Sequence, residues 1–400
     1  MSQENPANLI RSWNLMSGWN TGPVREDKLT PVKYGRLRTL FNHTWREEQI
    51  SSNFDWGSQN FSVYLPESLY VVGSIYLKIE LPVNNSGNYK DFPGIFALKQ
   101  LRIMSNGTEV YTADCNLFFH DYLESLSDEA LRVFSETYLG KKSAASGAAR
   151  TVMIPIMLPN SAYMGRADGT SHSHGIFPCF LGQSRLELQL TMNPATFVAA
   201  DAANAPGSIA GACSLMYHQV ELAENKRGSY ADLRGNYSII NRRFTELTSG
   251  WTHCAGAGSA NEQHVNQYQP QGTVTEILII AVADDADDSR HDVAYIMPDS
   301  LKITADSIVQ KDLDTPQKVR AELWTNGYVP NATFTSPGRL CFAAHCSTTD
   351  HVFSGGYNMQ LASNVDIAFT FPSACRYKVV ASQIQRVSID AVGKIRARLE

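Results

Sequence analysis

Residues 58–82 read SQNFSVYLPESLYVVGSIYLKIELP, and this stretch indicates two strands separated by a short break. Apolar residues occupy every second position over 61–65 and again over 75–81. A period of two is typical of strands that bury one face. Pro66 and Pro82 end the two runs, as expected of a residue that cannot donate a hydrogen bond to a strand ladder. The stretch therefore predicts a mainly β protein.

The second half of the chain repeats this order of elements. Residues 273–283 read TVTEILIIAVA and form a second long strand candidate, in which Ile277 lies 200 positions after Leu77. In each half the long strand is followed by a loop, further strands, a helical segment and three or four more strands. Such duplication predicts two copies of one eight-stranded antiparallel sandwich. With long connections between strands, the jelly roll is the most economical such sandwich.

Length and composition are consistent with two domains. At 400 residues the chain exceeds the usual size of a single core, and 43% of its residues are hydrophobic. We predict an N-terminal arm over 1–48, a first jelly roll over 49–225, a linker over 226–244 and a second jelly roll over 245–400. The arm lacks periodicity, and the linker is charged and contains glycine.

Composition argues against a secreted or membrane-spanning protein. The first eight residues are polar and no apolar segment of a signal peptide follows them. The longest purely apolar run, residues 277–283, is far shorter than the ~20 residues of a membrane-spanning helix. The seven cysteines contain no CxxC pair, which favours reduced, mostly buried thiols. We therefore expect a soluble protein without disulfides.

Two clusters partly match metal sites. His172 and His174 have the HxH spacing of metal-binding cupins, but the required glutamate would fall where Pro178 and Cys179 stand. The acidic loop over 284–292 lacks the residue order and the glycine of an EF-hand. No Walker A sequence, nucleophile elbow or HExxH motif occurs. The sequence therefore predicts no catalytic residue, no cofactor and no metal site.

Four segments of the first half carry a family resemblance. They are NFSVYLPESLYVVGSIYLKIELP (60–82), FALKQLRIMSNGTEVYTADCNLFFHDYLESLS (96–127), TVMIPIMLP (151–159) and HGIFPCFLGQSRLELQLTM (174–192). These segments resemble the first domain of double jelly-roll major capsid proteins, the adenovirus-like lineage of tailless icosahedral viruses. The second half is similar to that family mainly in the order of its elements. The resemblance implies an all-β fold of two tandem eight-stranded jelly rolls with short helices in the loops.

The resemblance also implies a function. It implies a major capsid protein without catalytic activity, whose homotrimers form the pseudo-hexagonal capsomers of an icosahedral virion. The implied partners are further copies of the chain, in the trimer and in neighbouring capsomers, together with penton and minor capsid proteins and with internal membrane lipids or the packaged genome. The implied location is the virion, after assembly in the host cytoplasm or nucleus. The alternative is a carbohydrate-binding or glycan-hydrolysing tandem β-sandwich, as in a spike or lectin-like protein.

Basic residues gather near both ends of the chain. Residues 1–50 carry a net charge of +2 and residues 376–400 carry +4, whereas the whole chain carries −5. Basic ends on an acidic body indicate contact with an anionic surface, and pairing with local acids is the alternative. The candidate contacts on the inward face of a capsid are Arg11, Trp13, Trp19, Lys33, Arg36, Arg38, Lys394, Arg396 and Arg398.

Overall fold

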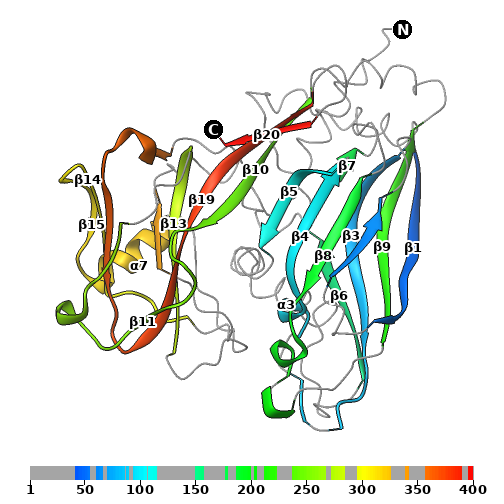
Figure 1. Cartoon of the computed structure of the whole chain (residues 1–400), viewed down its shortest axis with the longest axis horizontal. Helices are drawn as coiled ribbons and strands as arrows, with labels where there is room; N and C mark the ends of the chain where they lie inside the picture. Colours follow the sequence, from blue (N-terminus) through cyan, green and yellow to red (C-terminus); the bar gives the residue numbers. More distant parts are fainter. Residues whose placement is uncertain are drawn as a thin grey trace.

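Over the residues that it describes, the computed structural model of the chain is mainly built of antiparallel strands (Figure 1). It describes residues 41–54, 60–65, 70–85, 87–89, 93–105, 107–114, 149–156, 176–178, 186–199, 202–204, 211–222, 237–266, 272–283, 295–325, 338–341, 356–389 and 395–399. Within these ranges the strands form four sheets, two from each half of the chain. We refer to strands β1–β9 as the first copy and to strands β10–β20 as the second copy.

The first copy consists of two sheets. One has the strand order β1-β9-β3-β6, with β7 paired to β3, and the other has the order β2-β8-β4-β5. The bounds are β1 (Phe41–Phe54), β2 (Asn60–Tyr64), β3 (Tyr70–Leu81), β4 (Leu98–Ser105), β5 (Thr108–Asp114), β6 (Arg150–Ile156), β7 (Ile176–Pro178), β8 (Glu187–Met192) and β9 (Gly211–Leu222). Leaving the short β7 aside, the eight strands are arranged 1-8-3-6 and 2-7-4-5, which is the order of a jelly roll.

The second copy has the same strand order. Its sheets are β10-β19-β13-β16, to which the short strands β11, β17 and β20 are added, and β12-β18-β14-β15. The bounds are β10 (Tyr237–Glu246), β11 (Thr252–Cys254), β12 (Gln263–Val265), β13 (Thr273–Ala283), β14 (Ser300–Ala305), β15 (Ile308–Leu313), β16 (Gly338–Cys341), β17 (Tyr357–Asn358), β18 (Val365–Thr370), β19 (Cys375–Ile389) and β20 (Ile395–Leu399). The predicted fold class, two tandem jelly rolls, is confirmed.

Each copy has its core between its two sheets. In the first copy Ile75, Leu77 and Ile79 of β3 are fully buried, and so is Leu188 of β8 in the facing sheet. In the second copy Phe369, Phe371 and Tyr377 pack together, with ring centroids 5.0–5.7 Å apart. Burying one large apolar side chain stabilises a fold by about 1.5–3 kcal/mol, so these inner faces hold the sandwiches together.

The structure also agrees with the tight turn and the capped helix that the sequence predicts. The hairpin predicted at Asn106-Gly107 falls between β4 and β5; Asn106 lies outside the described residues, and Gly107 has φ = 74°, the left-handed conformation that such a turn requires. Asp306 and Ser307 have positive φ in the matching turn of the second copy. The predicted helix at 315–324 is α7 (Pro316–Thr325), and the hydroxyl of Thr315 accepts a hydrogen bond from the backbone N–H of Lys318.

Three predictions of local structure are wrong. Residues 41–48, expected in the arm, begin β1, and residues 237–244, expected in the linker, belong to β10. Both strands lie at the edge of a sheet, where each pairs along its length with one long neighbour, β9 or β19. Side chains 44–49 are exposed on both faces of β1, so the alternation of apolar and polar residues that identifies a strand is missing there. The strand expected from Phe96 is preceded by the short helix α3 (Pro93–Ala97). The remaining domain boundaries stay predictions.

The two copies contact each other beside β5. Strands β10 and β20 of the second copy lie against β5 of the first (Figure 1). Strand β20 pairs with the end of β19, so the last strand of the chain extends the second copy towards the first. No helix among the described residues is long and apolar enough to cross a membrane.

Candidate functional site

The predicted inner-face residues lie mostly outside the described part of the chain. Arg396 and Arg398 belong to β20, where they stand opposite Ser388 and Arg386 of β19. The residues outside the described ranges are Arg11, Trp13, Trp19, Lys33, Arg36, Arg38 and Lys394. Contact of these residues with an anionic surface therefore stays a prediction.

The clusters considered as metal sites also lie outside the described ranges. This applies to His172, His174 and the acidic loop over 284–292. The residues that the structure describes contain no group of three or more His, Cys, Asp or Glu side chains placed to hold a metal ion. The four cysteines in this part of the chain are free and buried, as predicted for reduced thiols: Cys213, Cys254, Cys341 and Cys375.

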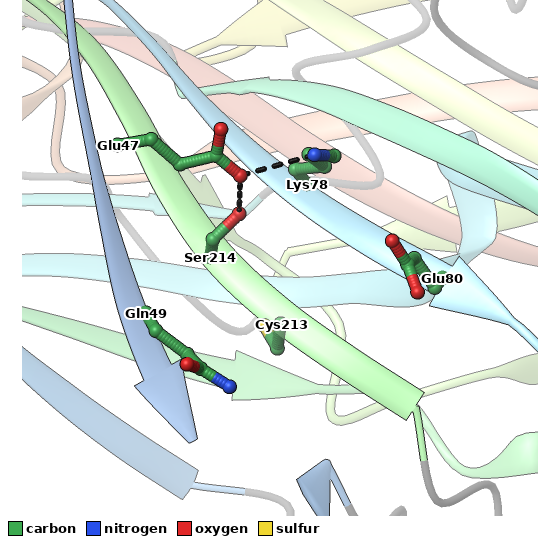
Figure 2. Close-up of a pocket in the computed structure, with 6 residues that line it drawn as sticks. All are labelled: Glu47, Gln49, Lys78, Glu80, Cys213 and Ser214. Carbon is green, nitrogen blue, oxygen red and sulfur yellow. Dashed lines mark hydrogen bonds and ion pairs between the residues drawn. The ribbon is translucent and has the colours of Figure 1, made fainter. Parts of the chain in front are cut away.

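The outer face of the sheet β1-β9-β3 is hollowed into a pocket of about 450 Å³. Glu47 and Gln49 enter it from β1, Lys78 and Glu80 from β3, and Ser214 from β9 between them (Figure 2). The strand register brings these residues together, because Gln49 and Lys78 both stand opposite Ser214. Cys213 completes the lining. The pocket is thus made by three strands that are far apart in the sequence.

Charges in this pocket are only partly paired. The carboxylate of Glu47 accepts hydrogen bonds from Ser214 Oγ (2.7 Å) and Lys78 Nζ (3.0 Å). These two donors, Ser214 first, hold the pKa of Glu47 below its ordinary value. The exposed carboxylate of Glu80 has no ion-pair partner among the described residues. Two carboxylates and one ammonium leave the pocket with a net charge of −1.

An exposed aromatic ring lies beside the pocket. Trp45 is two residues before Glu47 on β1, on the same face of the strand, and its side chain is 57% exposed. Its ring centroid lies 6.4 Å from that of Tyr76, which is buried against the sheet. We call Trp45, Glu47, Lys78 and Glu80 the open face. Aromatic residues are enriched in protein–protein interfaces relative to the rest of a protein surface.

The equivalent face of the second copy is buried, and apolar residues replace the charged residues of the open face there. Leu278, Ile280 and Val282 of β13 are exposed by at most 5%, and they form a cluster with Tyr295 and Val380. Lys78 and Glu80 of the first copy are replaced, 200 positions later, by Leu278 and Ile280. Phe244 and Trp251 pack against this cluster. The two copies therefore share one fold but differ in the chemistry of this sheet face.

Helix α7 presents a second exposed surface. Its residues Val319 and Leu323 are buried against the sheet, whereas Gln317, Arg320 and Trp324 are exposed. These three positions follow each other at intervals of three and four residues, so they form one stripe along the helix. Trp324 is 71% exposed, and Arg320 forms no ion pair with any described residue. We call Gln317, Arg320 and Trp324 the α7 stripe.

Sequence reasoning identified neither surface. Their residues come together only through strand register and helix packing, which periodicity does not specify. The usable signal was the internal repeat, because aligning the copies places charged Lys78 and Glu80 against apolar Leu278 and Ile280. Both surfaces present aromatic and charged groups suited to contact with another protein.

No protein-family model and no curated protein matches the sequence. Solved structures match it over nearly its whole length. The VP54 protein of the virus PBCV-1 is 12% identical, with a TM-score of 0.63 over 89% of this chain and 96% of VP54. The Faustovirus major capsid protein is 10% identical, with a TM-score of 0.54 over 96% and 98% of the two chains. The mavirus major capsid protein is 12% identical, with a TM-score of 0.52 over 96% of this chain and 94% of that protein.

These similarities cover both jelly rolls. The strand order 1-8-3-6 and 2-7-4-5 occurs twice in this chain, and the matched structures are aligned across both copies. The chain has the double jelly-roll fold of viral major capsid proteins.

Proposed function

We propose that this protein is the major capsid protein of an icosahedral virion, a structural coat subunit without catalytic activity. One observation carries the proposal. The chain matches 98% of the Faustovirus major capsid protein and 94% of the mavirus major capsid protein, so the likeness extends to both sandwiches and their connection. A protein that shared a single jelly roll with an unrelated module would match only part of those chains.

The coat subunit assembles as a homotrimer. Two sandwiches of the same topology in one chain present two similar flanks, so three chains around a threefold axis give six near-equivalent blocks. Such a pseudo-hexagonal capsomer tiles a surface. The proposed partners are copies of the chain in the trimer and in neighbouring capsomers, with penton and minor capsid proteins at other positions. The proposed location is the capsid, after assembly in the host cytoplasm or nucleus.

The basic ends of the chain face inward in this proposal. There the candidate contacts would meet lipid phosphates of an internal membrane or the packaged genome. The supporting observation is the net charge of +2 over residues 1–50 and +4 over residues 376–400, on a chain whose overall charge is −5. Positive ends on a negative body favour contact with an anionic surface.

Light scattering on the purified full-length protein tests the function. We expect a particle of about three times the 44.2 kDa subunit mass, and three-fold or pseudo-hexagonal particles in negative-stain micrographs. The same sample should neither bind nor hydrolyse glycans in an array. A clean monomer at micromolar concentration, or turnover of a glycan, would contradict the proposal.

A further inference from the structure

We infer that the α7 stripe of one subunit docks onto the open face of the next subunit of the trimer. The inference names the surfaces through which copies of the chain meet, and it therefore rests on the proposed function. The occupant of the open face is a second copy of this chain. The stripe contributes Arg320 and Trp324, and the open face contributes Trp45, Glu47 and Glu80.

The contact between the two copies within the chain supports this arrangement. Strand β10 of the second copy lies against β5 of the first. In the jelly-roll order β10 corresponds to β1, and β5 corresponds to β15. If the same neighbour relation recurs between chains, β1 of one subunit meets the β15 side of the next. A contact that repeats head to tail in this way can close into a ring.

Helix α7 lies on the side that this relation selects. It follows β15 directly along the chain and packs against β14, β15 and β16. A subunit that approaches the β15 side of its neighbour therefore meets α7, whose outward side is the stripe. The open face lies beside β1 in the sheet β1-β9-β3. It therefore belongs to the subunit whose β1 meets the β15 side of its neighbour.

The two copies also differ as this arrangement requires. A face that stays covered within one chain can be apolar, as Leu278 and Ile280 are. A face that is exposed until subunits assemble must remain soluble, because large exposed apolar patches promote aggregation. Lys78 and Glu80 at the corresponding positions satisfy that condition. The charged face is thus suited to a contact formed after folding.

The two surfaces carry charges of opposite sign and have a similar spacing between aromatic and charged residues. The pocket on the open face has a net charge of −1, and Glu80 and Arg320 are both exposed and not ion-paired within the described residues. Arg320 and Trp324 are one turn apart on α7, about 6 Å along its axis. Trp45 and Glu47 are about 6.6 Å apart along β1. Each surface therefore places one aromatic ring near a charged side chain at similar spacing, Trp324 near Arg320 and Trp45 near Glu47, and Trp and Arg commonly dominate interface energies.

Charge-reversal variants of the full-length protein test the inference. Arg320→Glu and Glu80→Arg should each raise the dissociation constant of the trimer at least about tenfold, the change that 1.4 kcal/mol produces. The double variant, Arg320→Glu with Glu80→Arg, should restore association. Lys99→Glu reverses an exposed charge on β4, outside both surfaces, and should leave the dissociation constant unchanged. Dilution series in sedimentation velocity give the constants, and circular dichroism with thermal melts verifies folding.

The outcomes separate this inference from the proposed function. If the native protein is a trimer and both single variants fold and associate normally, the docking surfaces are wrong and the coat function stands. If the single variants weaken association but the double variant does not restore it, the pairing of Arg320 with Glu80 is wrong. If the native protein is a monomer, both the inference and the proposed function fail. Weakening by Trp324→Ala, with normal folding, would support the stripe independently of charge.

Discussion

Removing one partner of a buried ion pair should destabilise the second copy strongly. Arg339 of β16 is fully buried, and its Nη1 lies 3.3 Å from Oε2 of Glu276, whose side chain is 4% exposed. Replacing Arg339 with Met leaves the Glu276 carboxylate buried beside Leu278 without this arginine. Breaking such a pair costs about 3–5 kcal/mol, because the remaining charge loses its compensation. For a domain of this size that corresponds to a fall in melting temperature of roughly 6–20 °C.

The double variant Glu276→Leu with Arg339→Met provides the decisive comparison. It removes both charges from the buried face, so it should melt closer to the native protein than Arg339→Met does. Differential scanning calorimetry of the native protein, both single variants and the double variant gives the coupling between the two residues. A fall of less than about 2 °C for Arg339→Met, or a double variant that melts at the sum of the two single losses, would refute the reasoning.

Four further outcomes can be measured. Leu188→Asp should prevent folding because its side chain is fully buried, whereas Gln189→Asp on the other side of β8 should yield soluble protein with a native circular dichroism spectrum; equal yields would contradict the strand assignment. Deleting residues 1–30 should leave a soluble trimer that binds anionic vesicles more weakly at low salt and forms no closed shells, since each basic residue near such a surface contributes about 1 kcal/mol; unchanged binding and assembly would exclude the arm as the inner contact. Burial raises the pKa of Cys213 to about 12, so iodoacetamide at pH 8 should modify this thiol only after unfolding, and rapid labelling of the native protein would disprove its burial. The pKa of Glu47 is lowered in the folded state, so its stabilising contribution is present above the unfolded pKa of about 4.3 and is lost as the pH falls through the folded pKa. The difference in urea midpoint between the native protein and Glu47→Gln should therefore shrink on acidification from pH 7 to pH 3. A difference that grows on acidification would contradict the lowered pKa.

The strands that bury one face were predictable from the sequence. In β3, apolar Leu77 and Ile79 point into the core while Lys78 and Glu80 face outward, so the alternation is visible directly. In β13 both faces are buried, and the strand shows instead as an uninterrupted apolar run that its length and the repeat identify.

The edge strands and the open face were not predictable in the same way. Strand β1 is exposed on both faces over residues 44–49, so its sequence shows no alternation of apolar and polar residues. Its place in the sheet is fixed by pairing with β9, a partner that lies far along the chain. The open face depends on the same pairing, because Glu47 meets Ser214 and Lys78 only when the register is known. Long-range register is information that a local pattern does not contain.

The pairing of the first and eighth jelly-roll strands in each copy sets the order of events during synthesis on the ribosome. Phe41 of β1 pairs with Leu222 of β9, and Tyr237 of β10 pairs with Ile389 of β19. Neither sandwich can close until its eighth jelly-roll strand, β9 or β19, has left the exit tunnel. At about 5–20 residues per second, the stretch from the end of β9 to the end of β19 takes roughly 8–33 s to translate, which gives the first copy time to fold before the second is complete. The second copy closes only once β19 has emerged, and until then β10 is an unpaired edge. In each copy the first strand therefore stays unpaired while about 150–180 residues are translated, and chaperone binding should concentrate on β1 and β10 during these intervals.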